Sequence, residues 1–181
     1  IMSNLKSILS SFHLKDKLNP KIWVLPNERT MYDTKGQMET MRPKVRERLI
    51  DIADEFIDFL GVDLIVSDVM MTGSLANYNW SQFSDIDLHI IVDFEQFSDR
   101  ELPLYEELFK LKKTLFNDKH NITIFGYDVE LYVQNESESH FSSCEYSVLY
   151  DEWITKPKID NTEIDTELIK KKSQQWMNQI D

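Results

Sequence analysis

The chain has 181 residues, 41% of them hydrophobic, and a formal net charge of −12, which indicates one folded domain and excludes an intrinsically disordered chain. The acidic balance disfavours electrostatic capture of duplex DNA. Four glycines exclude Gly-rich repeats and a Gly-rich dinucleotide loop, and the single cysteine excludes an internal disulfide framework and a cysteine-based zinc site.

Residues 1–40 are irregular, with prolines and asparagines between short apolar groups, and we expect an extension that packs onto a core. The first regular element is predicted to begin at Pro43, because proline suits the first turn of a helix. Apolar residues at helical spacing then continue to Gly61, which is placed to end the helix. These apolar residues are Val45, Leu49, Ile52, Ala53, Phe56, Phe59 and Leu60.

Two strands with a short helix between them are predicted next. Residues 62–72 are partly β-branched and lie between Gly61 and Gly73, which is typical of a strand. A short helical stretch is expected over residues 75–82. Residues 85–94 alternate in polarity and predict a second strand. Its two faces carry Ile86, Leu88, Ile90 and Val92 on one side and Asp85, Asp87 and His89 on the other.

A long helix is predicted after this strand. Its start is indicated in two ways, by a capping box formed by Ser98 and Glu101 or by Pro103 in the first helical turn. Leucines at helical spacing then continue the helix to about Phe116. These are Leu104, Leu108, Leu111 and Leu115.

The remaining residues are predicted to form strands and one more helix. Residues 121–125 and 127–134 are expected as strands joined at Gly126. The second of these alternates Val129, Leu131 and Val133 with Asp128, Glu130 and Tyr132. Residues 144–154 are expected as a strand or short hairpin, and residues 162–179 as a terminal amphipathic helix.

The order of these elements predicts a mixed α/β (α+β) domain, a small mixed sheet flanked by helices. We expect residues 1–40 to be the packed extension, 41–135 the core, and 136–181 a loop, strand and helix that complete the same domain. No apolar run approaches the roughly 20 residues that a membrane span needs. We therefore expect a soluble, cytoplasmic protein without a membrane partner.

Residues 70–92 carry the most informative pattern. A strand ends at Gly73 and Ser74, and Asp85 and Asp87 follow on one face of the next strand. Glycine allows a phosphate to approach the backbone, and a serine hydroxyl with the amides and dipole of a helix start favours phosphate oxygens. Two carboxylates at positions i and i+2 of a strand project together and suit Mg²⁺. Each half alone is common in turns and strand ends, whereas the two together indicate a site.

A later strand adds a third acidic residue. Glu130 lies on the face opposite the apolar residues of that strand, and Asp128 is a competing candidate on the same face. Three carboxylates in one cleft raise one another's pKa unless cations are bound. The pattern therefore predicts a metal centre that includes Asp85, Asp87 and a carboxylate from this strand.

Gly73-Ser74, the run Asp85-Ile86-Asp87-Leu88 and a later acidic residue together resemble the DNA polymerase beta-like nucleotidyltransferase superfamily. In that family an apolar residue, Gly, and Gly or Ser precede, by roughly nine to thirteen residues, an Asp-apolar-Asp/Glu-apolar run. The resemblance covers residues 62–134. Within the superfamily, the chain is most similar in its motifs to the small, stand-alone members. The flanks around residues 18–23 and 153–157 resemble phage-encoded ones.

The resemblance implies a palm-like sheet, two Mg²⁺ ions with Mn²⁺ as a substitute, and transfer of a nucleoside monophosphate from a nucleoside triphosphate to a hydroxyl, with loss of pyrophosphate. It implies that Gly73 and Ser74 hold the β- and γ-phosphates and that Asp85 and Asp87 bind the metals. It further implies that Glu130 completes the site of the metal that activates the acceptor hydroxyl. The acceptor stays open between a protein, an RNA end and a small molecule, as does the choice of nucleotide.

Other readings accompany this one. A catalytically silent member that binds a nucleotide or a protein is the main alternative, and carboxylates too far apart to share metals would favour it. A cyclic-dinucleotide synthase is disfavoured by the shortness of the chain. His89 is expected to be a partly buried, hydrogen-bonded residue rather than a ligand. The lysines at 110, 112, 113, 119 and 170–172 are typical of solvated helix faces, with contact to a triphosphate or RNA as the alternative.

Overall fold

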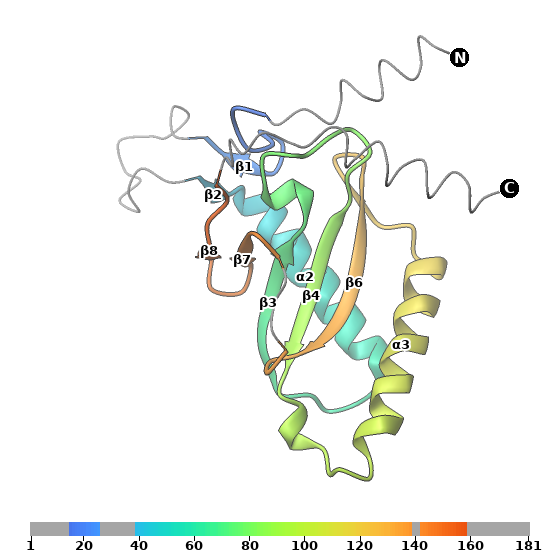
Figure 1. Cartoon of the computed structure of the whole chain (residues 1–181). Helices are drawn as coiled ribbons and strands as arrows, with labels where there is room; N and C mark the ends of the chain where they lie inside the picture. Colours follow the sequence, from blue (N-terminus) through green and yellow to red (C-terminus); the bar gives the residue numbers. More distant parts are fainter. Residues whose placement is uncertain (1–14, 26–38, 139–141, 159–181) are drawn as a thin grey trace, which may run out of the picture.

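The computed structural model describes residues 15–25, 39–138 and 142–158 (Figure 1). Within these ranges the chain forms a mixed α+β fold, with two α-helices, one sheet of six strands and one sheet of two. The helices are α2 (Pro43–Leu60) and α3 (Leu102–Lys119). The strands are β1 (Trp23–Val24), β2 (Thr40–Met41), β3 (Val66–Thr72), β4 (Ile86–Val92), β5 (Thr123–Ile124), β6 (Tyr127–Asn135), β7 (Glu145–Ser147) and β8 (Glu152–Thr155).

The strand order in the large sheet is β5-β6-β4-β3-β7-β8. Strands β4 and β6 are parallel, and every other neighbouring pair is antiparallel. Helix α3 is the crossover between the two parallel strands, as a parallel pair requires. The expected mixed sheet flanked by helices is therefore confirmed. None of the helices in the described ranges combines the length and the apolar character that crossing a membrane demands.

Helix α2 confirms the prediction for residues 43–60. Pro43 lies in the first turn, and Gly61 ends the helix in the left-handed conformation, with φ +67°. The apolar stripe turns to the core, where Val45, Leu49, Ile52, Ala53, Phe56 and Leu60 are buried. The charged residues of the helix remain on its outer side, so burial of one stripe fixes its orientation.

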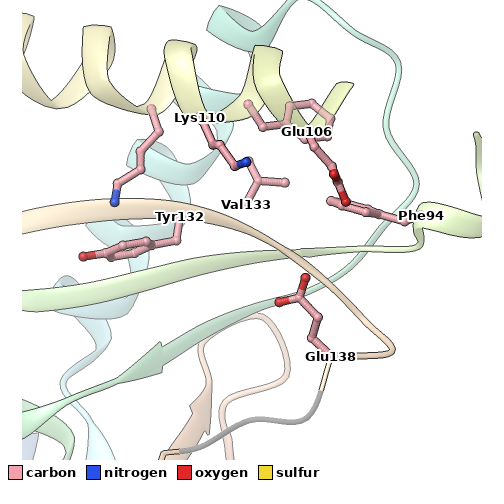
Figure 2. A pocket seen from close by; sticks show the side chains of 8 residues that line it. Phe94, Glu106, Lys110, Tyr132, Val133 and Glu138 are labelled. Atoms are coloured by element: carbon pink, nitrogen blue, oxygen red, sulfur yellow. The ribbon is translucent and has the colours of Figure 1, made fainter. Parts of the chain in front are cut away.

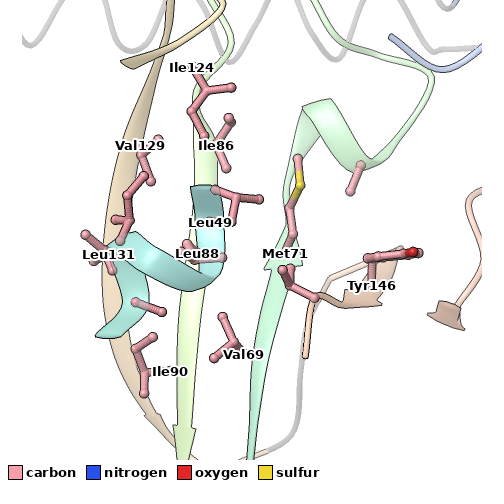
Figure 3. Close-up of a cluster of buried hydrophobic side chains, with 14 of the residues drawn as sticks. Leu49, Val69, Met71, Ile86, Leu88, Ile90, Ile124, Val129, Leu131 and Tyr146 are labelled. Carbon is pink, nitrogen blue, oxygen red and sulfur yellow. The ribbon is translucent and has the colours of Figure 1, made fainter. Parts of the chain in front are cut away.

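The core lies between the two helices and one face of the sheet. Leu49 of α2 packs among alternate residues of β3, β4 and β6, as Figure 3 shows. These residues include Val69, Met71, Ile86, Leu88, Ile90, Val129 and Leu131, all buried. Because side chains alternate along a strand, the residues between them point to the other face, away from this core. That second face carries the acidic residues.

Helix α3 begins at Leu102, with Pro103 in its first turn, and ends at Lys119, three residues beyond the predicted end. The Ser98 hydroxyl does donate to a Glu101 carboxylate oxygen, at 2.5 Å, but this contact precedes the helix. Of its side chains, Phe109 and Phe116 are buried in the core, whereas Leu104, Leu111 and Leu115 are exposed. The aromatic residues, not the leucines, thus anchor α3.

The predicted short helix over residues 75–82 is wrong. A single 3-10 turn, Ser74–Ala76, replaces it, and Asn77 is already extended. Side chains here bond to the backbone: Asn77 Oδ1 accepts from the Tyr78 N–H at 2.7 Å, and Ser84 Oγ accepts from the Ser81 N–H at 3.0 Å. Such local bonds compete with helical hydrogen bonds and favour turns.

The ends of the described chain pack on the core. Leu18, Ile22 and Trp23 are fully buried, and the Trp23 ring contacts Tyr146 and stacks on Trp153. Strands β7 and β8 form the hairpin that was one of two predictions for residues 144–154. The predicted helix over residues 162–179 and most of the predicted extension, residues 1–14 and 26–38, lie outside the described residues.

Candidate metal centre

The three acidic residues predicted to bind metal come from two neighbouring strands. Asp85 directly precedes β4, Asp87 lies in β4 and Glu130 lies in β6. Asp87 pairs with Glu130 on one side and with Thr72 of β3 on the other. Because paired residues of neighbouring strands point to the same face, the carboxylates of Asp87 and Glu130 emerge side by side.

The three carboxylates form a group that can hold a metal ion. Each of Asp85, Asp87 and Glu130 is partly buried and offers one ligand oxygen, and these oxygens lie within 4.8 Å of one another. Carboxylate oxygens are the hard ligands that divalent cations such as Mg²⁺ prefer. Asp128, the competing candidate, is exposed, pairs with Thr123 of β5 and does not belong to the group. The donor set therefore fits a divalent cation.

The electrostatics of the group favour a bound cation as well. Burial first, and then the charges of the neighbouring Asp85 and Glu130 carboxylates, raise the pKa of Asp87 to about 6. The ammonium group of Lys113 acts in the opposite direction. The surroundings of Asp87 thus disfavour its charged form. A cation bound between the carboxylates would offset both the cost of burying this charge and the repulsion from Asp85 and Glu130.

Gly73 borders the group for a steric reason. Its backbone has φ +79° and ψ −166°, a conformation that is accessible almost only to glycine. A Cβ atom at this position would overlap the Oδ2 atom of Asp87. The sequence suggested that glycine is needed for a phosphate to approach, and the structure adds that the Asp87 carboxylate itself requires the space.

Ser74 differs from the expectation. Its hydroxyl donates to Ser84 Oγ at 2.6 Å, so it is engaged within the loop that leads to Asp85. The helix that was expected to begin here is the three-residue turn Ser74–Ala76. A turn of that length contributes almost no aligned dipole, and the predicted help from a helix N-terminus is therefore wrong.

Sequence reasoning missed Tyr132 as a neighbour of the metal group. Its hydroxyl donates to Glu130 Oε2 at 2.5 Å. Burial, together with Glu130, raises the pKa of this hydroxyl, so Tyr132 keeps its proton and acts as a donor. The available signal was its position two residues after Glu130, on the same face of a predicted strand.

His89 and Lys113 surround the Tyr132 ring. His89 Nε2 lies 3.2 Å from Thr72 Oγ1, which fits the expectation of a hydrogen-bonded histidine, and its ring stacks on Tyr132 with centroids 4.9 Å apart. The Lys113 ammonium lies 3.6 Å from the Tyr132 ring centroid. Of the lysines noted in the sequence, Lys113 thus lies at the site, whereas residues 170–172 are outside the described chain.

Two cavities lie near the group, one lined by its neighbour Tyr132 and the other by one of its carboxylates. One of about 420 Å³ lies between α3 and β6 and is lined by Glu106, Lys110, Lys113, Tyr132 and Glu138 among others (Figure 2). The second, of about 220 Å³, is lined by Glu130 itself together with Asn117, Asn121 and Asp128. The carboxylate group is therefore open to molecules from the side of Glu130.

Comparison with known proteins gives no relative: no protein-family model, no curated protein sequence and no solved structure matches this chain.

Proposed function

We propose that this protein is a Mg²⁺-dependent nucleotidyltransferase, which transfers a nucleoside monophosphate from a nucleoside triphosphate to an acceptor hydroxyl. The observation that carries the proposal is the convergence of Asp85, Asp87 and Glu130, whose ligand oxygens lie within 4.8 Å of one another, next to Gly73. Two of the carboxylates are separated in sequence from the third by more than forty residues, so their convergence is a property of the fold.

The order of elements supports the proposal. Helix α2, the antiparallel strands β3 and β4, the crossover α3 and the parallel strand β6 give the connectivity expected of a palm-like core. Asp85 and Asp87 lie at the start of β4 and Glu130 lies opposite Asp87 in β6, which agrees with the acidic residue in a later strand that the resemblance to the nucleotidyltransferases implies. One position departs from the family pattern, because Thr72 stands where an apolar residue precedes the glycine.

The chemistry is an in-line displacement at the α-phosphorus. The acceptor oxygen forms a bond to the phosphorus while the bond to the bridging oxygen of the β-phosphate breaks, and pyrophosphate leaves. When two Mg²⁺ or Mn²⁺ ions are bound by Asp85, Asp87 and Glu130, they supply charge neutralisation for the attacking and leaving oxygens. In this proposal Glu130 also accepts the proton of the acceptor hydroxyl.

The other residues bind and orient the substrate. We assign the β- and γ-phosphates to the backbone around Gly73, and the Ser74 hydroxyl, which bonds to Ser84 in this structure, donates to them once it turns away from Ser84. We assign the acceptor to the side of Glu130, where the polar cavity of about 220 Å³ lies. A protein, an RNA end and a small molecule are the three kinds of acceptor that could present a hydroxyl there.

The alternative is a silent member of the same family that binds a nucleotide or a protein without reaction. That function predicts carboxylates too far apart to share cations. The separation of at most 4.8 Å between their ligand oxygens counts against it. The engaged hydroxyl of Ser74 is the single observation in its favour.

The proposal is tested by following the α-phosphate. The full chain is incubated with each α-labelled nucleoside triphosphate, Mg²⁺ and fractions containing protein, RNA or small-molecule acceptors. We expect label on one acceptor fraction and an equal amount of pyrophosphate, both lost in the Asp85→Asn/Asp87→Asn variant and kept in Asp51→Asn, which changes an exposed acid of α2. Pyrophosphate release that is absent with all four nucleotides and every fraction, or undiminished in the double variant, contradicts the proposal.

A further inference from the structure

Tyr132 restrains one oxygen of Glu130. The two residues are two positions apart in β6, so their side chains leave the same face of the sheet about 7 Å apart along the strand. The long Tyr132 side chain spans that distance, and its hydroxyl donates to Oε2 of Glu130 at 2.5 Å. A short bond from a neutral hydroxyl to a carboxylate is a strong one. It restricts rotation of the Glu130 carboxylate, which needs to offer only one oxygen to the metal group.

The Tyr132 ring is itself held from two sides. His89 of β4, the residue paired with Tyr132, stacks on it at 4.9 Å with an angle of 15° between the rings. Lys113 comes from α3, on the other side of β6, and its ammonium lies 3.6 Å from the ring centroid. A nearly parallel ring covers one face, so the ammonium takes the opposite one. The attraction of an ammonium to an aromatic face holds this arrangement.

His89 is in turn fixed against β3. Its Nε2 atom lies 3.2 Å from the hydroxyl oxygen of Thr72, which precedes Gly73 and pairs with Asp87. A connected path therefore runs from Thr72 through His89 and Tyr132 to Glu130. Each member touches the next, and the path borders the metal group on one side.

We propose that Tyr132 is a positioning residue of the metal centre, whose hydroxyl orients the Glu130 carboxylate toward Asp87 while His89 and Lys113 orient the Tyr132 ring. The inference rests on the proposed function in one respect, that Glu130 is a metal ligand. Tyr132 does not touch the metal. It acts through Glu130, as the hydrogen-bonded partners of ligating carboxylates do in metal sites.

The test measures Mn²⁺ binding to the full chain by electron paramagnetic resonance, together with thermal unfolding. We expect Tyr132→Phe, which keeps the ring and removes only the hydroxyl, to raise the Mn²⁺ Kd roughly 10-fold. Tyr150→Phe is the matched control, because the Tyr150 hydroxyl donates to the Ser67 carbonyl outside the metal group. We expect its Kd to equal that of the wild type.

A double variant separates positioning from a general effect on the fold. If Tyr132 acts through Glu130, Tyr132→Phe adds no further loss of Mn²⁺ affinity in the Glu130→Gln background. An equal Kd for wild type and Tyr132→Phe, or losses that add in the double variant, overturns the inference and leaves the proposed function standing. Absence of saturable Mn²⁺ binding to the wild type overturns both.

A second variant keeps the inference testable if Tyr132→Phe does not fold. Lys113→Met keeps most of the aliphatic stem and removes the ammonium that holds the ring. We expect it to raise the Mn²⁺ Kd severalfold, less than loss of the hydroxyl does, although it removes a positive charge and so reduces repulsion of the cation. A Kd for Lys113→Met at or below that of the wild type overturns the inference.

Discussion

The carboxylate of Asp87 occupies the space that a side chain at Gly73 would need. The two residues lie on adjacent segments, the end of β3 and the start of β4, and Oδ2 of Asp87 lies where a Cβ at position 73 would be built. The glycine and the aspartate of the sequence pattern are thus in direct contact. This contact gives a steric reason why a glycine at position 73 accompanies an aspartate at position 87.

Gly73→Ala is expected to disrupt the metal group. The added methyl group displaces the Asp87 carboxylate, and the backbone conformation at φ +79° is strained for alanine, with a cost of about 1–3 kcal/mol in stability. Gly61→Ala is the control, because Gly61 also has a positive φ but has no atom within 4 Å of the added Cβ. It should cost about 1–2 kcal/mol and leave Mn²⁺ affinity unchanged. Equal Mn²⁺ affinity of Gly73→Ala and wild type would falsify the steric account.

Glu130→Gln and Asp128→Asn should differ sharply. Both replace an acid by its amide on the same face of β6, but only Glu130 belongs to the group whose ligand oxygens converge. We expect Glu130→Gln to weaken Mn²⁺ binding at least roughly 10-fold, and Asp128→Asn to change it less than about twofold. Calorimetric titration of both variants checks this. The reverse order of effects would make Asp128 the third ligand.

Metal affinity should depend on pH through Asp87. Its pKa is raised from 3.8 to about 6, chiefly by burial, so the carboxylate is largely protonated below that pH and must lose its proton to bind a cation. The apparent Mg²⁺ affinity should therefore rise as the pH increases from about 5 to 7 and level off above. Calorimetry in buffers of different ionisation enthalpy should detect proton release near pH 6. An affinity that is constant from pH 5 to 7 argues against this assignment.

The metal-free protein should become more stable in the Asp87→Asn variant at neutral pH. Because the pKa of Asp87 is raised in the folded state, the folded protein holds the proton more tightly than the unfolded chain. Its contribution to stability is fully present below pH 3.8 and is lost as the pH rises to about 6. After allowance for solvent screening, we expect a gain of about 1 kcal/mol for Asp87→Asn at pH 7.

Chemical denaturation with and without Mg²⁺ checks the sign of this effect. The difference between Asp87→Asn and wild type should vanish well below pH 3.8, where Asp87 is protonated in both the folded and the unfolded chain. Saturating Mg²⁺ should reverse the order at pH 7, because only the wild type gains stability from the ion. A variant that is less stable than wild type without metal at pH 7 contradicts the electrostatic description of the group.

Much of the fold could be predicted from sequence, because a helix or strand that buries only one of its faces shows a clear periodic pattern of apolar residues. Helix α2 has a proline start, a glycine end and a continuous apolar stripe, and the alternation around Asp87 identified the face of β4 that is not core. The turn after Gly73 could not be predicted from apolar spacing, because the hydrogen bonds of Asn77 and Ser84 to the backbone decide it. Local polar bonds override a weak helical periodicity.

The candidate site was predictable only in part. The spacing of Asp85 and Asp87 is local, but the choice between Asp128 and Glu130 depends on the register of β6 against β4, which pairs Glu130 with Asp87. Lys113 was not predictable, since it meets Tyr132 only through the packing of α3 beside β6, whereas Tyr132 had a local signal in its position two residues after Glu130. The spacing of residues within one segment does not specify the register in which that segment pairs with a distant one.

Nucleotide binding is the measurement that most directly tests the account. Calorimetric titration of the full chain with non-hydrolysable analogues of the four nucleoside triphosphates needs no acceptor. We predict that at least one analogue binds in the presence of Mg²⁺, that chelation of the metal abolishes the binding, and that Asp85→Asn/Asp87→Asn does not bind it. If no analogue binds the wild type with Mg²⁺, or the double variant binds with undiminished affinity, the protein is not a metal-dependent nucleotidyltransferase.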